Sequence, residues 1–299
     1  MSTITPRATK PKHDAIEATA PDRVDRLLAG GLLALAAGLA AVALLGPLAT
    51  GVVDYRVTET LRNQTIGLDA ISLFLVTPLA VGTALLVRRG RVAGYALALP
   101  VGAYTSYMFA QYVLGPDYIH LAGNNEKLFP LCLALFAAGW IVSLTAWNRL
   151  PPNPAPDTRD RDRLIGRILL PILALLAFVR YLPALADAMS ANPSEEGYLA
   201  GPAFFWTIAL LDLGVFLPAT IATCIGLLRG SRWAHKALYL VAGWFGLVGA
   251  AVAAMAIAMQ INDDPTATTA NTILMTALGA AFVLLAIYVF RPLLGTAQR

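Results

Sequence analysis

Hydrophobic residues dominate the chain in long, uninterrupted runs that are separated by short polar segments. A helix needs about 20 mostly apolar residues to cross the hydrocarbon core of a bilayer. The runs lack the two-residue alternation of apolar and polar positions that a membrane barrel strand would require. They predict eight membrane helices, over residues 27–53, 68–87, 92–114, 128–147, 164–186, 202–228, 233–260 and 271–290. We therefore expect an all-α, polytopic bundle of membrane helices.

The composition agrees with a lipid bilayer environment. Of the 299 residues, 58% are hydrophobic and only 13% are charged, whereas about 25% of the residues of a soluble domain are charged. In a soluble protein the net charge of +4 would raise the question of nucleic-acid binding. The positions of the charges offer a simpler explanation, and we expect no nucleic-acid partner.

Basic residues gather on one side of the predicted membrane. With a cytoplasmic N-terminus, only Arg56, Arg62 and Lys127 lie in outer loops, while Arg180 lies inside a predicted span. All other Lys and Arg residues then face the cytoplasm, as the positive-inside rule requires. We expect an inner (plasma) membrane protein with both termini cytoplasmic, and contact between its basic loops and anionic lipids.

The loops divide the chain into two similar halves. We expect a disordered cytoplasmic leader (1–26), a four-helix half (27–150), a proline-rich charged linker (151–163), a second four-helix half (164–290) and a cytoplasmic tail (291–299). The stretches RVAGYALAL at 91–99 and RWAHKALYL at 232–240 share five residues at equal spacing. They indicate a parallel 4+4 repeat with a two-fold axis along the membrane normal. Shared helix composition explains the same match.

Asp212 is the most informative polar residue, because it lies about ten residues inside a predicted span and thus near the bilayer midplane. A charge there costs about 2.5 to 3.5 kcal/mol on insertion scales, so the side chain should face other helices, a cavity or a partner. Arg180, in the preceding span, is the expected ion-pair partner. The pair is either a proton or cation site or a fastener between helices. Pro218 follows six residues later and frees a backbone carbonyl in the same helix.

A second group of polar residues lies at the outer ends of the second and third predicted spans. It comprises Asn63, Gln64, Asp69, Tyr104, Tyr107 and Gln111. The last three share one helix face at three- and four-residue spacing. The group is typical either of an extracytoplasmic pocket with aromatic walls or of an interfacial aromatic belt with ordinary helix caps.

This group also carries a resemblance. The stretch TLRNQTIGLDAISLFLVTPL, followed by YTSYMFAQYVLGPDY, resembles a family of uncharacterised bacterial multi-pass membrane proteins with an N-Q-x-x-G-x-D motif at the second span. Asn63, Gln64, Gly67 and Asp69 match that motif, and Tyr104, Tyr107, Tyr112 and Gly115 resemble the aromatic third span of the family. The resemblance covers about a third of the chain and implies a membrane location without implying an activity.

Signatures of catalysis, metal binding and cofactors are missing from the sequence. The three histidines, His13, His120 and His235, are expected in the leader, outside and inside, so no two of them can share a metal or haem. The sequence contains no H-E-x-x-H, G-x-S-x-G or Walker motif. We therefore expect no cofactor and no metal, and the sequence leans away from an enzyme.

Three function hypotheses follow. The leading one is a small-solute or proton-coupled transporter or binder, with Asp212 and Arg180 as its coupling pair and the region of Asp69 and Tyr107 as its outer vestibule. The second is a non-catalytic accessory or scaffold protein whose polar residues only hold helices together. The third is a membrane enzyme in which Asp69 and Glu126 converge on one extracytoplasmic acid/base site.

Overall fold

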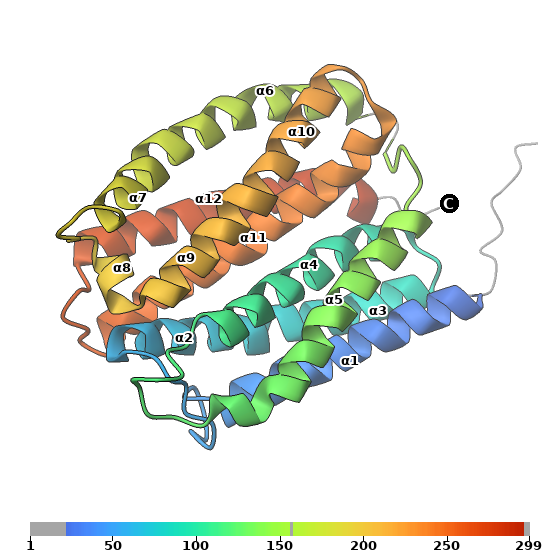
Figure 1. Ribbon diagram of the computed structural model, residues 1–299. Coiled ribbons are helices and arrows are strands. Elements are labelled where there is room, and N and C mark those ends of the chain that lie inside the picture. Colours follow the sequence, from blue (N-terminus) through green and yellow to red (C-terminus); the bar gives the residue numbers. More distant parts are fainter. Residues whose placement is uncertain (1–21, 156–157, 296–299) are drawn as a thin grey trace, which may run out of the picture.

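The computed structural model describes residues 22–155 and 158–295, and within these ranges all regular structure is helical (Figure 1). The helices are α1 (Arg23–Leu45), α2 (Glu59–Ile71), α3 (Thr77–Arg88), α4 (Val92–Leu114), α5 (Phe129–Arg149), α6 (Arg159–Leu176), α7 (Leu182–Ala188), α8 (Glu196–Ala200), α9 (Pro202–Leu211), α10 (Leu217–Leu228), α11 (Arg232–Ile261) and α12 (Thr269–Gly295). Short π-helical segments join three pairs of them: η1 (Ser72–Val76), η4 (Ala177–Tyr181) and η5 (Asp212–Phe216).

Within the described residues, six helical segments are long and apolar enough to cross a membrane: Arg23–Leu45, Glu59–Arg88, Asn125–Arg149, Pro202–Leu228, Arg232–Ile261 and Thr269–Leu294. The chain is therefore an all-α, multi-pass membrane protein. The expected spans 92–114 and 164–186 are helical but do not belong to this set, so the count of eight spans stays a prediction. In α4 the apolar run is interrupted by Pro100, Gln111 and several tyrosines.

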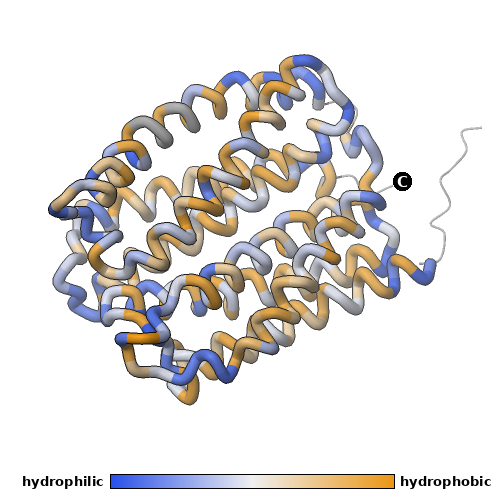
Figure 2. The backbone as a smooth tube through the Cα atoms, in the orientation of Figure 1, coloured by the Kyte–Doolittle hydropathy of each residue, from blue (hydrophilic) through white to orange (hydrophobic). Residues whose placement is uncertain are grey.

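The bundle has two polar ends and an apolar middle (Figure 2). One end, which we call the acidic end, collects the loops that carry Asp54, Asp117, Glu195 and Asp264. Backbone and side-chain hydrogen bonds join these loops, for example from the Asp54 amide to the Asn124 Oδ1 atom at 2.9 Å. The other end, the basic end, carries the short turns after α3 and α10 with their arginines.

Helices α4 and α11 form the centre of the bundle. They pack against each other, and each has one major partner that follows it in sequence, α5 for α4 and α12 for α11. Helix α2 packs on α11, and α9 packs on α4, so each half of the chain lays one helix against the centre of the other. Helix α6 packs mainly on α10 and lies at the edge of the molecule (Figure 1).

Each π segment ends two residues before a proline. The prolines are Pro78, Pro183 and Pro218. Proline donates no backbone hydrogen bond, and its ring collides with the carbonyl one turn earlier. The chain relieves this conflict by widening one turn, and the backbone N–H groups of Thr77 and Leu217 bond the carbonyls five residues back. These wide turns change the direction in which Ser72 and Asp212 present their side chains.

Two turns at the basic end are built alike. Pro78 and Pro218 are 140 residues apart, as are Gly90 and Gly230, which both have positive φ angles of 64° and 71°. The four backbone hydrogen bonds that link α3 to α4 recur between α10 and α11 at that same separation, including Gly90 N–H to Val87 C=O and Gly230 N–H to Leu227 C=O. Positive φ explains the glycine at both places.

Several expected boundaries are wrong by a few residues. Helix α1 begins at Arg23, so the end of the expected leader is helical, and it ends at Leu45, well before residue 53, because Gly46 and Pro47 stop it. Helix α6 begins at Arg159, inside the expected linker, and α12 runs to Gly295, into the expected tail. The rest of the expected leader (1–21), two residues of the expected linker (156–157) and the end of the expected tail (296–299) lie outside the described residues.

The first half is closed by very close helix contacts. A Cβ atom on Gly102 of α4 would lie 2.4 Å from the Gly139 carbonyl oxygen of α5, which shows how nearly the two backbones touch. Ser106 donates a hydrogen bond to the Phe136 carbonyl across this crossing, and Ser143 donates one back to the Leu99 carbonyl. Small residues of this kind permit membrane helices to pack by contact of their backbones.

Candidate functional site

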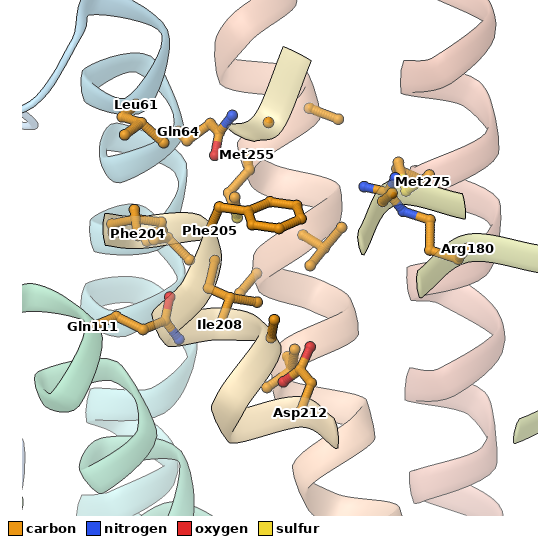
Figure 3. A pocket seen from close by; sticks show the side chains of 18 of the residues that line it. Leu61, Gln64, Gln111, Arg180, Phe204, Phe205, Ile208, Asp212, Met255 and Met275 are labelled. Atoms are coloured by element: carbon orange, nitrogen blue, oxygen red, sulfur yellow. The ribbon is translucent and has the colours of Figure 1, made fainter. Parts of the chain in front are cut away.

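A cavity of about 350 Å³ lies in the half of the bundle nearer the acidic end (Figure 3). Its walls come from α2, α4, η4, α7, α9, α11 and α12. Helices α6 and α7 do not pack extensively on α12, whereas the corresponding helices of the first half, α1 and α5, are in contact. The extensive contact between α1 and α5 therefore has no equally extensive counterpart in the second half, where the cavity lies.

Asp212 lies at the base of this cavity, as the first residue of η5. The Tyr107 hydroxyl of α4 donates a hydrogen bond of 2.8 Å to its Oδ1 atom, and the Tyr181 hydroxyl of η4 donates one to Oδ2. The side chain is partly exposed rather than buried, and it lines the cavity. Both donors are neutral hydroxyls, so neither brings a positive charge to this carboxyl group.

The expected ion pair between Arg180 and Asp212 is wrong. Arg180 instead lies 3.5 Å from Glu195 Oε1, and Figure 3 shows its side chain well apart from Asp212. Arg180 is in η4 and 64% exposed, so its long stem carries the guanidinium toward the acidic end, where water solvates it. Both residues nevertheless line the same cavity, Arg180 near its mouth and Asp212 at its base.

The rest of the wall is mainly apolar. Phe204, Phe205 and Ile208 of α9 face Met255 and Met259 of α11 and Met275 of α12. Polar groups are few: the amides of Gln64, Gln111 and Asn271. An apolar wall with a small number of placed polar groups is typical of a site for a small organic molecule, and the volume is within the usual range.

A second, shallower pocket adjoins the first at the acidic end. Its volume is about 410 Å³, and it shares Arg180, Ala184 and Glu195 with the first. Asp187 and Glu196 complete its charged lining. The Ser194 hydroxyl, the Ser194 amide and the Glu195 amide all donate to Asp187, and these hydrogen bonds lower the pKa of that carboxyl from its ordinary value. Asp187 is therefore an anion at neutral pH.

Asp69 does not belong to the cavity. It is 1% exposed, and the Tyr112 hydroxyl donates a hydrogen bond of 2.7 Å to its Oδ1 atom. Its Oδ2 atom has no partner among the described residues, and neither has the nearby Tyr55 hydroxyl. A Cβ atom on Gly46 would lie 2.8 Å from Oδ2. Asp69 is thus a buried, enclosed carboxyl on the side of α2 that faces α1.

The other residues of the expected outer pocket divide between the two environments. Gln64, Tyr107 and Gln111 line the cavity. Asn63 instead donates a hydrogen bond to Asp264 at 2.9 Å and fastens α2 to the loop before α12. Tyr104 is fully buried, and its hydroxyl lies 3.3 Å from the Ser72 hydroxyl. Of the residues expected at the outer pocket, Gln64, Tyr107 and Gln111 therefore line the cavity, whereas Asn63, Asp69 and Tyr104 do not.

Several cavity residues were not anticipated from the sequence. Tyr181 follows Arg180 directly, and Glu195 lies in an acidic loop, yet no local pattern distinguishes them. The π turn of η4 brings Tyr181 to Asp212. The aromatic pair Phe204-Phe205 and the three methionines belong to helices whose apolar residues could equally have faced lipid. The position of Pro183, two residues after Tyr181, was the available signal for the wide turn.

Metal and thiol chemistry have no assembled site in the part of the chain that the structure describes. No group of three or more His, Cys, Asp or Glu side chains is placed to hold a metal ion there. Cys132 and Cys224 are both free and buried. His120 bonds Asp117 at the acidic end, and His235 bonds Asp162 near the basic end.

No family model matches the chain, and no curated protein or solved structure matches it either.

Proposed function

We propose that this multi-pass membrane protein binds a small solute, coupled to a proton or cation, in the cavity at the acidic end. The observation that carries this proposal is the position of Asp212: a carboxylate at the base of a cavity, hydrogen-bonded by two hydroxyls and without an ion-pair partner among the described residues. An intramembrane carboxylate in such a cavity is costly unless a cation or proton neutralises it. Transport is the function that such a site supports best.

The orientation follows from the charges at the two ends. We place the acidic end outside and the basic end, with both termini, in the cytoplasm of a bacterial inner membrane, because basic loops are retained on the cytoplasmic side. The basic end then contacts anionic lipids. The cavity opens toward the outside, since Glu195 and Gly197, at the start of α8 at the acidic end, form part of its wall.

We also propose that the two halves derive from a tandem duplication, with all eight expected helices spanning the membrane. The constant separation of 140 residues supports this, because η1, Pro78, α3 and Gly90 all have counterparts at that distance. The similar stretches at 91–99 and 232–240 are 141 residues apart, so they lie one residue out of register with these counterparts and add no support. The crossed packing of α2 on α11 and α9 on α4 is the pattern that a two-fold axis between α4 and α11 produces. Many transporters are built from such parallel repeats.

The relation to the resembled bacterial family also stays a proposal. Within the motif, Gly67 has a structural reason, because a Cβ atom there would lie 2.5 Å from the Ala254 backbone. Asn63 fastens a loop and Asp69 is enclosed, so two further motif residues serve the packing of α2. Only Gln64 of the motif lines the cavity.

A scaffold protein is the second candidate, and one observation favours it. Tyr107, Asp212 and Tyr181 come from α4, η5 and η4, so their two hydrogen bonds tie three helices together as a structural fastener would. On this reading, the cavity is occupied by lipid tails and exchanges no solute. The enzyme hypothesis has less support, because Glu126 is engaged by Arg56 at 2.8 Å while Asp69 is enclosed with Tyr112.

Cysteine accessibility tests the proposed function. Ile208→Cys places a thiol on the cavity wall one turn before Asp212, in a chain whose Cys132 and Cys224 are replaced by alanine. We expect a small membrane-impermeant thiol reagent to modify it from the outer side of intact cells. Leu99→Cys, at a position 1% exposed, is the matched control and should remain unmodified.

The result has two readings only. Modification of position 208 from outside, with position 99 silent, supports a water-filled cavity that solutes reach. Silence at position 208 and at a second wall position, Met259→Cys, in protein that elutes as the folded species, contradicts the binding proposal and supports the scaffold. Met259 lies on α11, so its substitution is independent of α9.

A further inference from the structure

The two adjoining pockets differ sharply in charge from the rest of the apolar bundle. Four carboxylates line them, those of Asp187, Glu195, Glu196 and Asp212, against the single guanidinium of Arg180 among their lining residues. Arg180 is already paired with Glu195. The pockets therefore form a continuous negative region that leads from the acidic end to the base of the cavity.

The charges are ordered along this region. Asp187 and Glu196 belong only to the shallower pocket at the surface, Glu195 and Arg180 to the boundary of both, and Asp212 only to the deeper cavity. Clefts lined by one sign of charge and walled by apolar groups concentrate ions of the opposite sign. A cation that enters would first lie near the solvated carboxylates of the outer pocket and would then move to the less exposed carboxylate of Asp212 at the base.

The walls around Asp212 favour an organic cation over a metal ion. A bare metal ion requires about six oxygen ligands or its own waters. Asp212 offers one carboxylate, and its two hydroxyl neighbours already donate to it. Much of the remaining lining is apolar and includes Phe204, Phe205, Ile208 and four methionines, which suit an apolar body. Aromatic faces and thioethers also attract a delocalised positive charge.

We propose that the ligand of the cavity is a monovalent organic cation with an apolar body, bound with its charge at Asp212 after passing the Arg180–Glu195 pair. This inference rests on the proposed function, since it names the class of solute for the same cavity. An anion is disfavoured by the carboxylates of Asp187, Glu196 and Asp212, which have no ion-pair partner among the described residues, and an uncharged apolar solute would leave Asp212 without a counter-charge. Asp187 and Glu196 then raise the local concentration of the cation at the entrance of the cavity.

Equilibrium dialysis of the purified full chain in detergent tests the ligand class with a matched pair of probes. Tetraphenylphosphonium and tetraphenylborate have nearly the same shape and opposite charge. We expect saturable binding of tetraphenylphosphonium and no saturable binding of tetraphenylborate. Asp212→Asn should weaken phosphonium binding at least tenfold. Glu196→Gln should weaken it about twofold, and that smaller effect should vanish in high salt, because exposed charges are screened.

A protection experiment separates failure of this inference from failure of the proposed function. In the Ile208→Cys chain, which retains Asp212, a saturating concentration of tetraphenylphosphonium should slow modification of the thiol at least fivefold. Tetraphenylborate should not slow it. The additional change Asp212→Asn should abolish the protection. Modification that phosphonium does not slow, or that borate slows equally, overturns the cation inference and leaves the cavity standing. Absence of modification without any ligand overturns the proposed function as well.

Discussion

Asp69 and Asp212 are two carboxylates in similar helices with different surroundings. Each lies at or just before a π segment that precedes a proline, and each accepts a hydrogen bond from a tyrosine of α4, Tyr112 for Asp69 and Tyr107 for Asp212. Asp69 is 1% exposed in the closed first half, whereas Asp212 lines a cavity in the second half. The sequence placed Asp212 near the middle of one predicted span and Asp69 at the outer end of another, and packing decides which of the two carboxyls lines a cavity.

The cause of the difference lies in the neighbouring helices. In the first half, α1 packs against both α3 and α5, and the space beside α2 is filled. In the second half, α6 packs on α10, but neither α6 nor α7 packs extensively on α12. The cavity is lined by residues of both α7 and α12. In the first half, α4 and α5 also pack with their backbones in close contact at Gly102 and Gly139.

The largest expected effect comes from breaking that crossing. Gly102→Leu would drive a side chain into the α5 backbone, where even a Cβ atom has 2.4 Å. Overpacking of this kind costs about 1–3 kcal/mol, and more where backbone must move. We expect the Gly102→Leu protein to lose about that much free energy of unfolding and therefore to melt at a lower temperature in detergent. Gly82→Ala, where a Cβ atom meets nothing within 4 Å, is the control and should leave the melting temperature unchanged or slightly raised; equal losses in both would refute the close packing.

A smaller effect distinguishes the two carboxylates by their hydrogen bonds. Tyr112→Phe removes the one hydroxyl that reaches Asp69 in an enclosed site, and leaving such a group unsatisfied costs about 1–3 kcal/mol. Tyr107→Phe leaves Tyr181 on Asp212, and water in the cavity can replace the lost donor. We expect its cost to stay below about 1 kcal/mol. Chemical denaturation of the two variants measures the difference, and a larger cost for Tyr107→Phe would indicate that Asp212 is also dry.

The smallest effect is confined to the loop that walls the outer pocket. Asp187 has a lowered pKa because Ser194 and Glu195 donate hydrogen bonds to its anion. The stabilising contribution is complete above the unfolded pKa of about 3.9 and disappears as the pH falls through the lower folded value. We expect Asp187→Asn to speed amide exchange at Ser194 and Glu195 at neutral pH, and the difference from the wild type to shrink below about pH 4. A difference that is constant with pH would contradict this role.

The sequence allowed the architecture to be predicted better than the site. The apolar runs predicted the helices because lipid demands continuous apolar length, and α4 departs from the rule because its tyrosines and Gln111 face other helices. The depth of Asp212 in its predicted span led to the prediction that its side chain faces other helices or a cavity, and it does line a cavity. Its partner could not, because Arg180 is long enough to reach the acidic end and because the turn that delivers Tyr181 depends on how a proline conflict is relieved. Asp69 lies outside the cavity because the end of α1 at Gly46 packs against it, a tertiary contact that no local sequence pattern reveals.

The central claim is that water and solutes reach Asp212 and do not reach Asp69. The most direct test compares Asp212→Cys with Asp69→Cys, each in a chain with Cys132 and Cys224 replaced by alanine, by their reaction with a small membrane-impermeant thiol reagent on intact cells. The account predicts modification at position 212 and none at position 69 in protein that is folded and inserted. Equal modification at both positions, or modification at position 69 alone, would contradict it, as would silence at position 212 from both sides of the membrane.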